Sequence, residues 1–116
     1  MDCTTEAKKF MTNDISTPAV VIDMMIAQKN IEKLQAHCDQ HNIPLRPHIK
    51  THKLPCMAKR QIQAGAIGIT CQKIGEAEVM AQAGIKDILI TYNIIGQQKL
   101  DRLAQLVHKM QAVCCC

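Results

Sequence analysis

The hydrophobic residues of the chain fall into short continuous runs that alternate with stripes spaced three or four positions apart. The runs at residues 19–22, 66–71 and 85–91 are rich in isoleucine or valine, as is typical of buried strands. After the first run, Asp23 is a candidate N-cap for a helix whose apolar residues share one face. These residues are Met24, Ala27, Ile31, Leu34 and Cys38.

The same pattern predicts three more helices and one more strand. Residues 43–50 are expected to form a strand, because Pro44 and Pro47 disfavour helix in the residues before them. A helix should then begin at Pro55 and end at Gly65. A short helix is expected at 75–83, and a last one carries the stripe Leu100, Leu103, Val107 and Met110.

Strand and helix therefore alternate through four repeats, which predicts an α/β fold with a parallel sheet. Units of about 20 to 25 residues suit a TIM-like (β/α)8 barrel, which needs roughly 250 residues. With 116 residues, the chain is expected to be the N-terminal half of such a barrel. A small open doubly wound sheet is the alternative, although the G-x-G-x-x-G fingerprint of dinucleotide-binding folds is missing. The expected organisation is a tail at 1–16, a partial barrel domain at 17–113 and a cysteine tail at 114–116.

Composition and charge narrow the classes of partner. The net charge of +4 favours small anionic ligands without requiring a nucleic acid. No apolar run approaches the roughly 18 residues of a membrane span, and the N-terminus does not resemble a signal peptide. A soluble, cytoplasmic protein that binds neither membrane nor nucleic acid is therefore expected. The seven cysteines match neither a disulfide framework nor a C-x-x-C zinc pattern.

The densest group of chemically useful residues lies at 45–53, in the sequence Leu-Arg-Pro-His-Ile-Lys-Thr-His-Lys. On a strand, Arg46, His48 and Lys50 would share one face. Burial of Lys50 at the strand end, beside these basic neighbours, would lower the pKa of its amine. A neutral lysine amine is the nucleophile that forms a Schiff base with an aldehyde or ketone.

Other interpretations of this segment remain open. It could be a solvated basic loop that binds polyanions, although the chain has only Phe10 and Tyr92 for stacking on bases. It could hold a metal through His48, His52 and Cys56, whose spacing would align them on a helix. It could also be a charged strand end without chemistry.

Polar residues at two other strand ends strengthen the barrel interpretation. Gln72 and Lys73 follow one predicted strand, and Thr91, Tyr92 and Asn93 follow the next. Active-site residues of such barrels lie at the carboxyl ends of the strands, so these residues join Lys50 as candidates.

Three motifs stand out in the chain: Arg-Pro-His-Ile-Lys-Thr-His-Lys at 46–53, Gly-Ile-Thr-Cys-Gln-Lys at 68–73 followed by Glu-Ala-Glu at 76–78, and Ala-Gly-Ile-Lys-Asp-Ile-Leu-Ile at 83–90. Together they resemble the D-threonine aldolase and D-serine dehydratase family, and the region around Gln72 and Asn93 is most similar to the D-3-hydroxyaspartate aldolase branch. The resemblance implies a pyridoxal-phosphate enzyme with an alanine-racemase-like N-terminal barrel.

By this resemblance, Lys50 is the catalytic lysine that forms the Schiff base with the cofactor. His48 and Arg46 would line the cofactor, with Gln72 and Asn93 as further candidates for its surroundings. The implied activity is that of a lyase, cleaving D-3-hydroxy amino acids such as D-threonine or D-3-hydroxyaspartate by a retro-aldol reaction. D-serine dehydratase (ammonia-lyase) chemistry is the alternative. The family further implies a divalent metal and a homodimer.

The chain departs from the family in its extent. Full-length members have a complete barrel and a C-terminal β domain, which supply the phosphate-binding loop and the metal ligands. We therefore expect a fragment that keeps Lys50 but carries no metal ligands, binds cofactor weakly and turns over little substrate. A catalytically inactive basic fragment that binds anions or a partner chain is the corresponding alternative.

Overall fold

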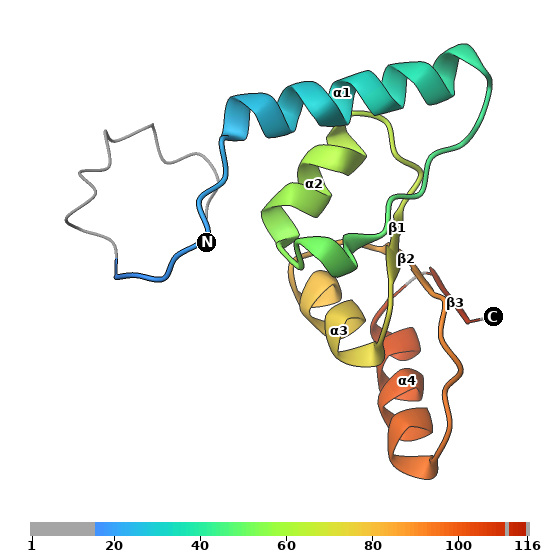
Figure 1. The fold of residues 1–116 in the computed structure, drawn as a ribbon. Helices are drawn as coiled ribbons and strands as arrows, with labels where there is room; N and C mark the ends of the chain where they lie inside the picture. Colours follow the sequence, from blue (N-terminus) through green and yellow to red (C-terminus); the bar gives the residue numbers. More distant parts are fainter. Residues whose placement is uncertain (1–15, 111, 116) are drawn as a thin grey trace.

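The computed structural model describes residues 16–110 and 112–115, in which helices cover one side of a parallel sheet (Figure 1). The sheet contains β1 (Ile69–Cys71), β2 (Asp87–Ile90) and β3 (Ala112–Cys115), in the order β1-β2-β3. The helices are α1 (Met24–Gln40), α2 (Pro55–Gln63), α3 (Ile74–Gln82) and α4 (Gln97–Lys109), with a single 3-10 turn, η2 (Ile49–Thr51). Alternating helices and parallel strands are thus confirmed from β1 onward.

The core lies between the sheet and the helices. Isoleucines from both central strands, including Ile69, Ile88 and Ile90, are completely or almost completely buried. They pack with Ala77 and Met80 of α3 and with neighbouring side chains of α2 and α4. Since side chains alternate along a strand, the residues between these isoleucines face the opposite side of the sheet. Among the described residues, no helix covers that side (Figure 1).

Helix α1 begins as the sequence predicts but packs less tightly than expected. Asp23 is its N-cap, and a carboxylate oxygen of Asp23 accepts hydrogen bonds from the backbone N–H groups of Met25 and Ile26 at 2.9 and 3.0 Å. Cys38 is buried, whereas Leu34 of the same stripe is 51% exposed. The N-cap is confirmed, while burial of the whole stripe is wrong.

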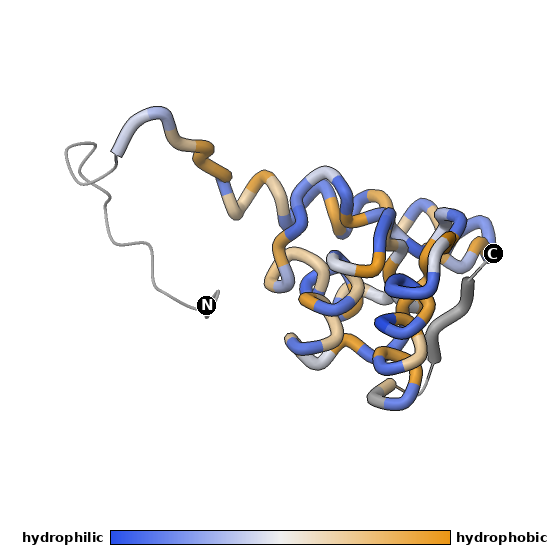
Figure 2. Tube along the Cα trace, turned by 90° about the horizontal axis from the view of Figure 1, so that it is seen from below, coloured by the Kyte–Doolittle hydropathy of each residue, from blue (hydrophilic) through white to orange (hydrophobic). Residues whose placement is uncertain are grey.

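The first predicted strand, residues 19–22, is absent: these residues are extended but pair with no strand. Val20 is 93% exposed, and Figure 2 shows the hydrophobic segment projecting from the rest of the molecule. A β-branched run forms a strand only where a neighbouring edge and a covered face are available to it. Of the tail predicted at 1–16, residues 1–15 lie outside the described residues.

The second predicted strand, residues 43–50, is formed only in part. His48 makes a single parallel bridge to Thr70, and the backbone N–H groups of Ile67 and Thr70 donate to the carbonyls of Leu45 and Pro47. The chain then turns into η2, so Lys50 lies in a 3-10 turn and not at the end of a strand. At the other end of the sheet, Cys114 and Cys115 are the last residues of β3 and pair with β2 through the backbone.

Candidate functional site

The face of the sheet opposite the core carries the candidate residues in successive rows. Strands β1 and β2 pair Thr70 with Leu89, and His48 bridges to Thr70, which forms one row across the sheet. Two residues earlier, the same register places Arg46 beside Gly68 and Asp87. Beyond His48 the chain leaves the strand and enters the η2 turn, which carries Lys50. Arg46 and His48 therefore lie on the same side of the sheet, whereas the predicted alternation does not extend to Lys50.

At the carboxyl end, His48, Lys50 and Gln72 come together. The backbone N–H of Lys50 donates to Nδ1 of His48 at 3.2 Å, which makes His48 the N-cap of η2. Nε2 of His48 lies 3.3 Å from Oε1 of Gln72. An imidazole nitrogen that accepts a hydrogen bond carries no proton, so the proton of a neutral His48 belongs on Nε2 and is donated to Gln72. Both nitrogens of His48 are thereby engaged in orienting its neighbours.

Lys50 is exposed. The predicted burial of its side chain is therefore wrong, because the lysine belongs to a turn above the sheet and not to the buried strand itself. Ile49, the preceding residue, is completely buried and anchors this turn in the core. The sequence thus places a primary amine in solvent on a well-anchored turn.

Arg46 lies at the opposite, amino end of the face. Its Nη1 is 2.5 Å from Oδ1 of Asp87, the first residue of β2. The guanidinium passes over Gly68, where an added Cβ would meet both the Arg46 guanidinium and the carbonyl oxygen of Asp87. The structure consequently separates Arg46 from His48 and Lys50 along the strand direction, and gives it a carboxylate partner that the sequence motif did not reveal.

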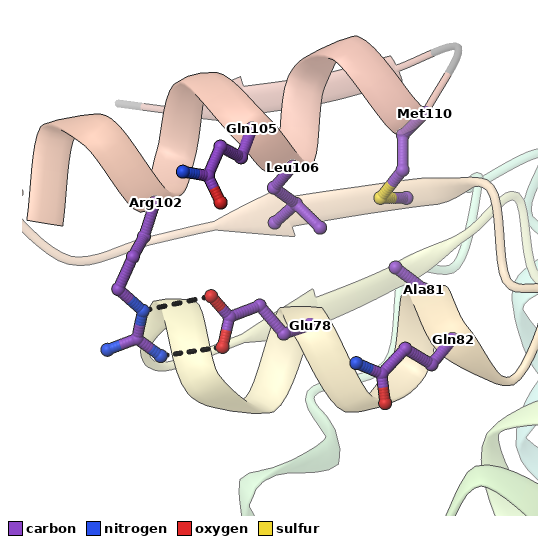
Figure 3. A pocket seen from close by; sticks show the side chains of 7 residues that line it. All are labelled: Glu78, Ala81, Gln82, Arg102, Gln105, Leu106 and Met110. Atoms are coloured by element: carbon purple, nitrogen blue, oxygen red, sulfur yellow. Dashed lines mark hydrogen bonds and ion pairs between the residues drawn. The ribbon is translucent and has the colours of Figure 1, made fainter.

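Gln72 and Asn93 line one cavity of about 320 Å³ at the carboxyl ends of β1 and β2. Lys73 and Lys99 line the same cavity, so its surroundings are basic. A larger cavity, of about 390 Å³, lies between α3 and α4 (Figure 3). There Glu78 and Arg102 form a two-point ion pair, with Nε···Oε1 at 2.9 Å and Nη2···Oε2 at 2.6 Å. That second cavity contains none of the candidate residues.

Glu76 is a site residue that sequence reasoning did not single out. Although charged, it is only 7% exposed, and its Oε2 accepts a hydrogen bond from the backbone N–H of Gln72 at 2.8 Å. The available signal was an acidic residue in the first turn of a helix that follows a strand, where a negative charge is favoured by the helix dipole. Burial of Cys71, followed in size by the charge of Glu76, raises the pKa of the Cys71 thiol to about 12. Cys71 is therefore a protonated core residue and not a nucleophile.

The proposed metal triad of His48, His52 and Cys56 does not form. Nδ1 of His52 accepts the backbone N–H of Leu54 at 3.0 Å, while His48 is engaged with Lys50 and Gln72. Within the described part of the chain, no three histidine, cysteine or acidic side chains are grouped so that they could hold a metal ion. The proline at 55 also starts a new helix there, so the three residues do not share one helix.

Among the residues that the structure describes, none of the helices has the length and apolar character needed to span a membrane.

The chain is similar in sequence to three kinds of enzyme. It is 42% identical over 101 residues to a D-threonine aldolase of Arthrobacter sp., covering 87% of this chain and 27% of that protein. It is 36% identical over 105 residues to a 3-hydroxy-D-aspartate aldolase of Paracoccus denitrificans, covering 90% of this chain and 27% of the relative. It is 45% identical over 92 residues to a D-threo-3-hydroxyaspartate dehydratase of Delftia sp., covering 79% and 24%. The chain therefore spans about a quarter of the length of these relatives.

Solved structures and a family profile agree with these relatives. A crystal structure of D-threonine aldolase from Filomicrobium marinum superposes with a TM-score of 0.85 at 40% identity, covering 90% of this chain and 28% of that one. The Delftia dehydratase gives a TM-score of 0.77 at 37% identity, covering 85% and 26%. The resemblance to these enzymes inferred from the three motifs is thus confirmed. The profile described as alanine racemase, N-terminal domain, matches residues 22–115, so the chain belongs to the alanine racemase N-terminal domain family.

Proposed function

We propose that this chain is the cofactor-attachment part of a pyridoxal-phosphate-dependent lyase that acts on D-3-hydroxy amino acids. The observation that carries the proposal is the position of Lys50. It is an exposed primary amine on an anchored turn at the carboxyl end of the sheet, where His48 and Gln72 converge. The similarity to D-threonine aldolase and 3-hydroxy-D-aspartate aldolase supports the reaction class, a retro-aldol cleavage.

The residues present fit pyridoxal phosphate. Lys50 Nζ is free to form a covalent carbon–nitrogen bond with the aldehyde of the cofactor, because the side chain reaches solvent. His48 and Gln72 would line the cofactor on one side, and Asn93 belongs to the adjoining cavity with its lysines. Arg46 would contribute at the amino end of the same face, where it forms an ion pair with Asp87.

The division of labour follows from this placement. When bound, the cofactor supplies a pyridine ring that accepts the electrons released as a bond to the substrate's Cα breaks. Lys50 would hold the cofactor through Nζ, and the same amine, when not bonded to the cofactor, would be the group that takes a proton from the substrate's hydroxyl. His48 keeps the Lys50 turn in place through the backbone N–H of Lys50 and orients Gln72 through Nε2.

We also propose that the chain forms the N-terminal half of a (β/α)8 barrel. The support for this is that residues 45–48 run parallel to β1 and are joined to it by backbone hydrogen bonds, and that no helix of the described residues covers the face that carries His48 (Figure 1). The exposed apolar residues 19–22 are suited to pair with a further strand. In a complete enzyme, the rest of the barrel would supply the remaining cofactor contacts, the ligands of a divalent metal and the contacts of a homodimer.

The test is to trap the cofactor on the purified chain. Pyridoxal phosphate is added, the absorbance spectrum is recorded, borohydride is added, and the modified peptide is identified by mass spectrometry. We expect an absorption band that borohydride bleaches, with the adduct on Lys50 and none in Lys50→Ala. Lys86→Ala is the matched control, because Lys86 is an exposed lysine just before β2, at the opposite end of the sheet. An adduct that persists unchanged in Lys50→Ala would contradict the proposal.

Dehydratase chemistry is the second candidate, and the 45% identity to D-threo-3-hydroxyaspartate dehydratase favours it. The two reactions are distinguished by their products, since a retro-aldol cleavage releases an aldehyde or a 2-oxo acid and glycine, whereas a dehydratase releases ammonia. A basic fragment that binds polyanions is the non-enzymatic alternative. It would give no specific adduct at Lys50 and would bind nucleic acid with a steep dependence on salt.

A further inference from the structure

The buried carboxylate of Glu76 connects two turns at the carboxyl end of the sheet. Its Oε2 accepts the backbone N–H of Gln72 at 2.8 Å, at the junction of β1 and α3. Its Oε1 lies 3.5 Å from Nζ of Lys53, just past the η2 turn. Glu76 is 7% exposed and the Lys53 side chain is 56% exposed, so the ion pair is sheltered on its acidic side only.

Lys53 is well placed to transmit this contact to Lys50. Its backbone N–H donates to the carbonyl of Ile49 at 2.8 Å and so closes the turn that contains Lys50. Lys53 adopts a φ of 54°, a left-handed conformation that non-glycine residues seldom adopt. Such a conformation persists where the surrounding contacts hold it, and Glu76 supplies one of them.

These contacts form a closed circuit around the candidate site. Glu76 holds Lys53 by charge, Lys53 closes the η2 turn, and the backbone N–H of Lys50 in that turn donates to His48. His48 then contacts the side chain of Gln72, whose backbone N–H returns to Glu76. Because these contacts are connected in a ring, the Glu76–Lys53 ion pair constrains the turn of Lys50 and the turn of Gln72 together. An isolated surface ion pair has no such effect.

We propose that Glu76 is a positioning residue that holds the Lys50 turn and the Gln72 turn in register at the site. This role rests on the proposed function only insofar as Lys50 binds the cofactor; the mechanical link can be measured without it. Glu76 acts through the backbone of Gln72 and the side chain of Lys53.

The test compares Glu76→Gln and Lys53→Met with Glu78→Gln in the full chain. Glu78→Gln is the matched control, because it removes the same charge from the same helix, where Glu78 pairs with Arg102. Hydrogen exchange of backbone amides, measured without cofactor, reports the link directly. In both test variants we expect the Lys50 and Gln72 amides to exchange about tenfold faster, with little change in the core strands. In Glu78→Gln these two amides should keep the wild-type rate.

Two further measurements sharpen the test. The rate at which pyridoxal phosphate and borohydride modify Lys50 should fall several-fold in Glu76→Gln and Lys53→Met. The double variant should be no worse than either single variant, because both break the same link. Unchanged amide exchange in Lys53→Met, whose exposed side chain leaves the core intact, would overturn the proposal. Faster exchange throughout the chain in Glu76→Gln would overturn it too, because that pattern indicates a general loss of stability.

The two proposals can fail separately. If the wild-type chain forms no adduct at Lys50 while amide exchange responds locally to Glu76→Gln, the proposed function fails and the positioning role stands. If the adduct forms at Lys50 and none of the measurements distinguishes Glu76→Gln from Glu78→Gln, the positioning role fails and the proposed function stands.

Discussion

Each end of the uncovered sheet face has a basic residue, but the two residues differ in their environment. At the amino end, Arg46 is paired with Asp87 above Gly68, and the charge is neutralised within the fold. At the carboxyl end, Lys50 is exposed, and His48 and Gln72 contact each other and the turn that carries it. One motif of five residues, from Arg46 to Lys50, thus spans a structural end and an end that is open to a ligand.

The difference between the two ends shows that one segment can carry a residue that stabilises the fold at one end and residues that bind a ligand at the other. Residues two positions apart along a strand are about 6.6 Å apart, and the η2 turn carries Lys50 beyond the row that contains His48. That spacing allows a paired charge at one end to leave the other end unaffected. Substitutions at the amino end should therefore change the free energy of unfolding, and substitutions at the carboxyl end should change ligand binding.

The largest effect is expected at Gly68. In Gly68→Ala the new Cβ would lie 2.8 Å from the carbonyl oxygen of Asp87, so the backbone or the Arg46–Asp87 pair must shift. We expect a loss of about 2 kcal/mol in the free energy of unfolding, in the range for overpacked sites. Urea denaturation measures it, with Gly75→Ala as the control. The nearest atom to a Cβ at Gly75 is an Arg102 nitrogen at 3.6 Å, so an equal loss there would contradict the interpretation.

A smaller effect is expected from removing the partner of Arg46. The Arg46 side chain is 23% exposed and that of Asp87 is 48% exposed, so solvent screens part of their interaction. We predict that Asp87→Ala lowers the free energy of unfolding by about 1 kcal/mol. Lys50→Ala, at the other end, should change it by less than about 0.5 kcal/mol. Thermal or urea denaturation measures the loss of free energy of unfolding in both variants. Equal losses in Asp87→Ala and Lys50→Ala would contradict the proposed difference between the two ends.

At the carboxyl end, His48 should affect cofactor trapping more than stability. His48→Ala removes the acceptor that caps the turn of Lys50, at a cost of about 1 kcal/mol by analogy with helix N-caps. It should also slow formation of the Lys50 adduct several-fold, as measured by borohydride trapping. His48→Asn offers a side-chain acceptor to the same N–H and should recover most of the stability. It lacks a group that reaches Gln72 in the same way, so only part of the trapping rate should return.

The smallest effect concerns acid stability through His52. Burial, the largest cause, lowers the pKa of His52 from its ordinary value of 6.5. The folded protein therefore binds this proton less readily than the unfolded chain. The stability linked to neutral His52 is present above pH 6.5 and is lost as the pH falls through the lower pKa of the folded state.

Urea denaturation between pH 5 and 7.5 should show this loss, and His52→Asn should reduce it. His37→Asn, at an exposed position of α1, controls for the replacement itself. A pH dependence that is the same in His52→Asn as in the wild type would exclude this histidine as its source.

The helix starts, which are marked by a capping residue or a proline, could be predicted from the sequence. Strands that depend on a neighbouring strand could not. Asp23 marks the start of α1 through its own side chain, and Pro55 marks the start of α2. Residues 19–22 were predicted as a strand from their β-branched composition, but a strand also needs a neighbouring edge that composition cannot supply. Strand β3 was not predicted, because the run that ends in cysteines has no distinctive pattern of its own.

The site shows the same division between local and long-range information. The sequence by itself determined that Arg46 and His48 share a face, because alternation is a property of extended backbone, but it did not reveal the turn that carries Lys50. It also marked Gln72 and Asn93 as residues that follow strands. Only the tertiary structure paired Arg46 with Asp87, exposed Lys50 and buried Glu76 between two turns. The Arg46–Asp87 and Lys53–Glu76 pairs join residues that are more than 20 positions apart, so local spacing does not reveal them.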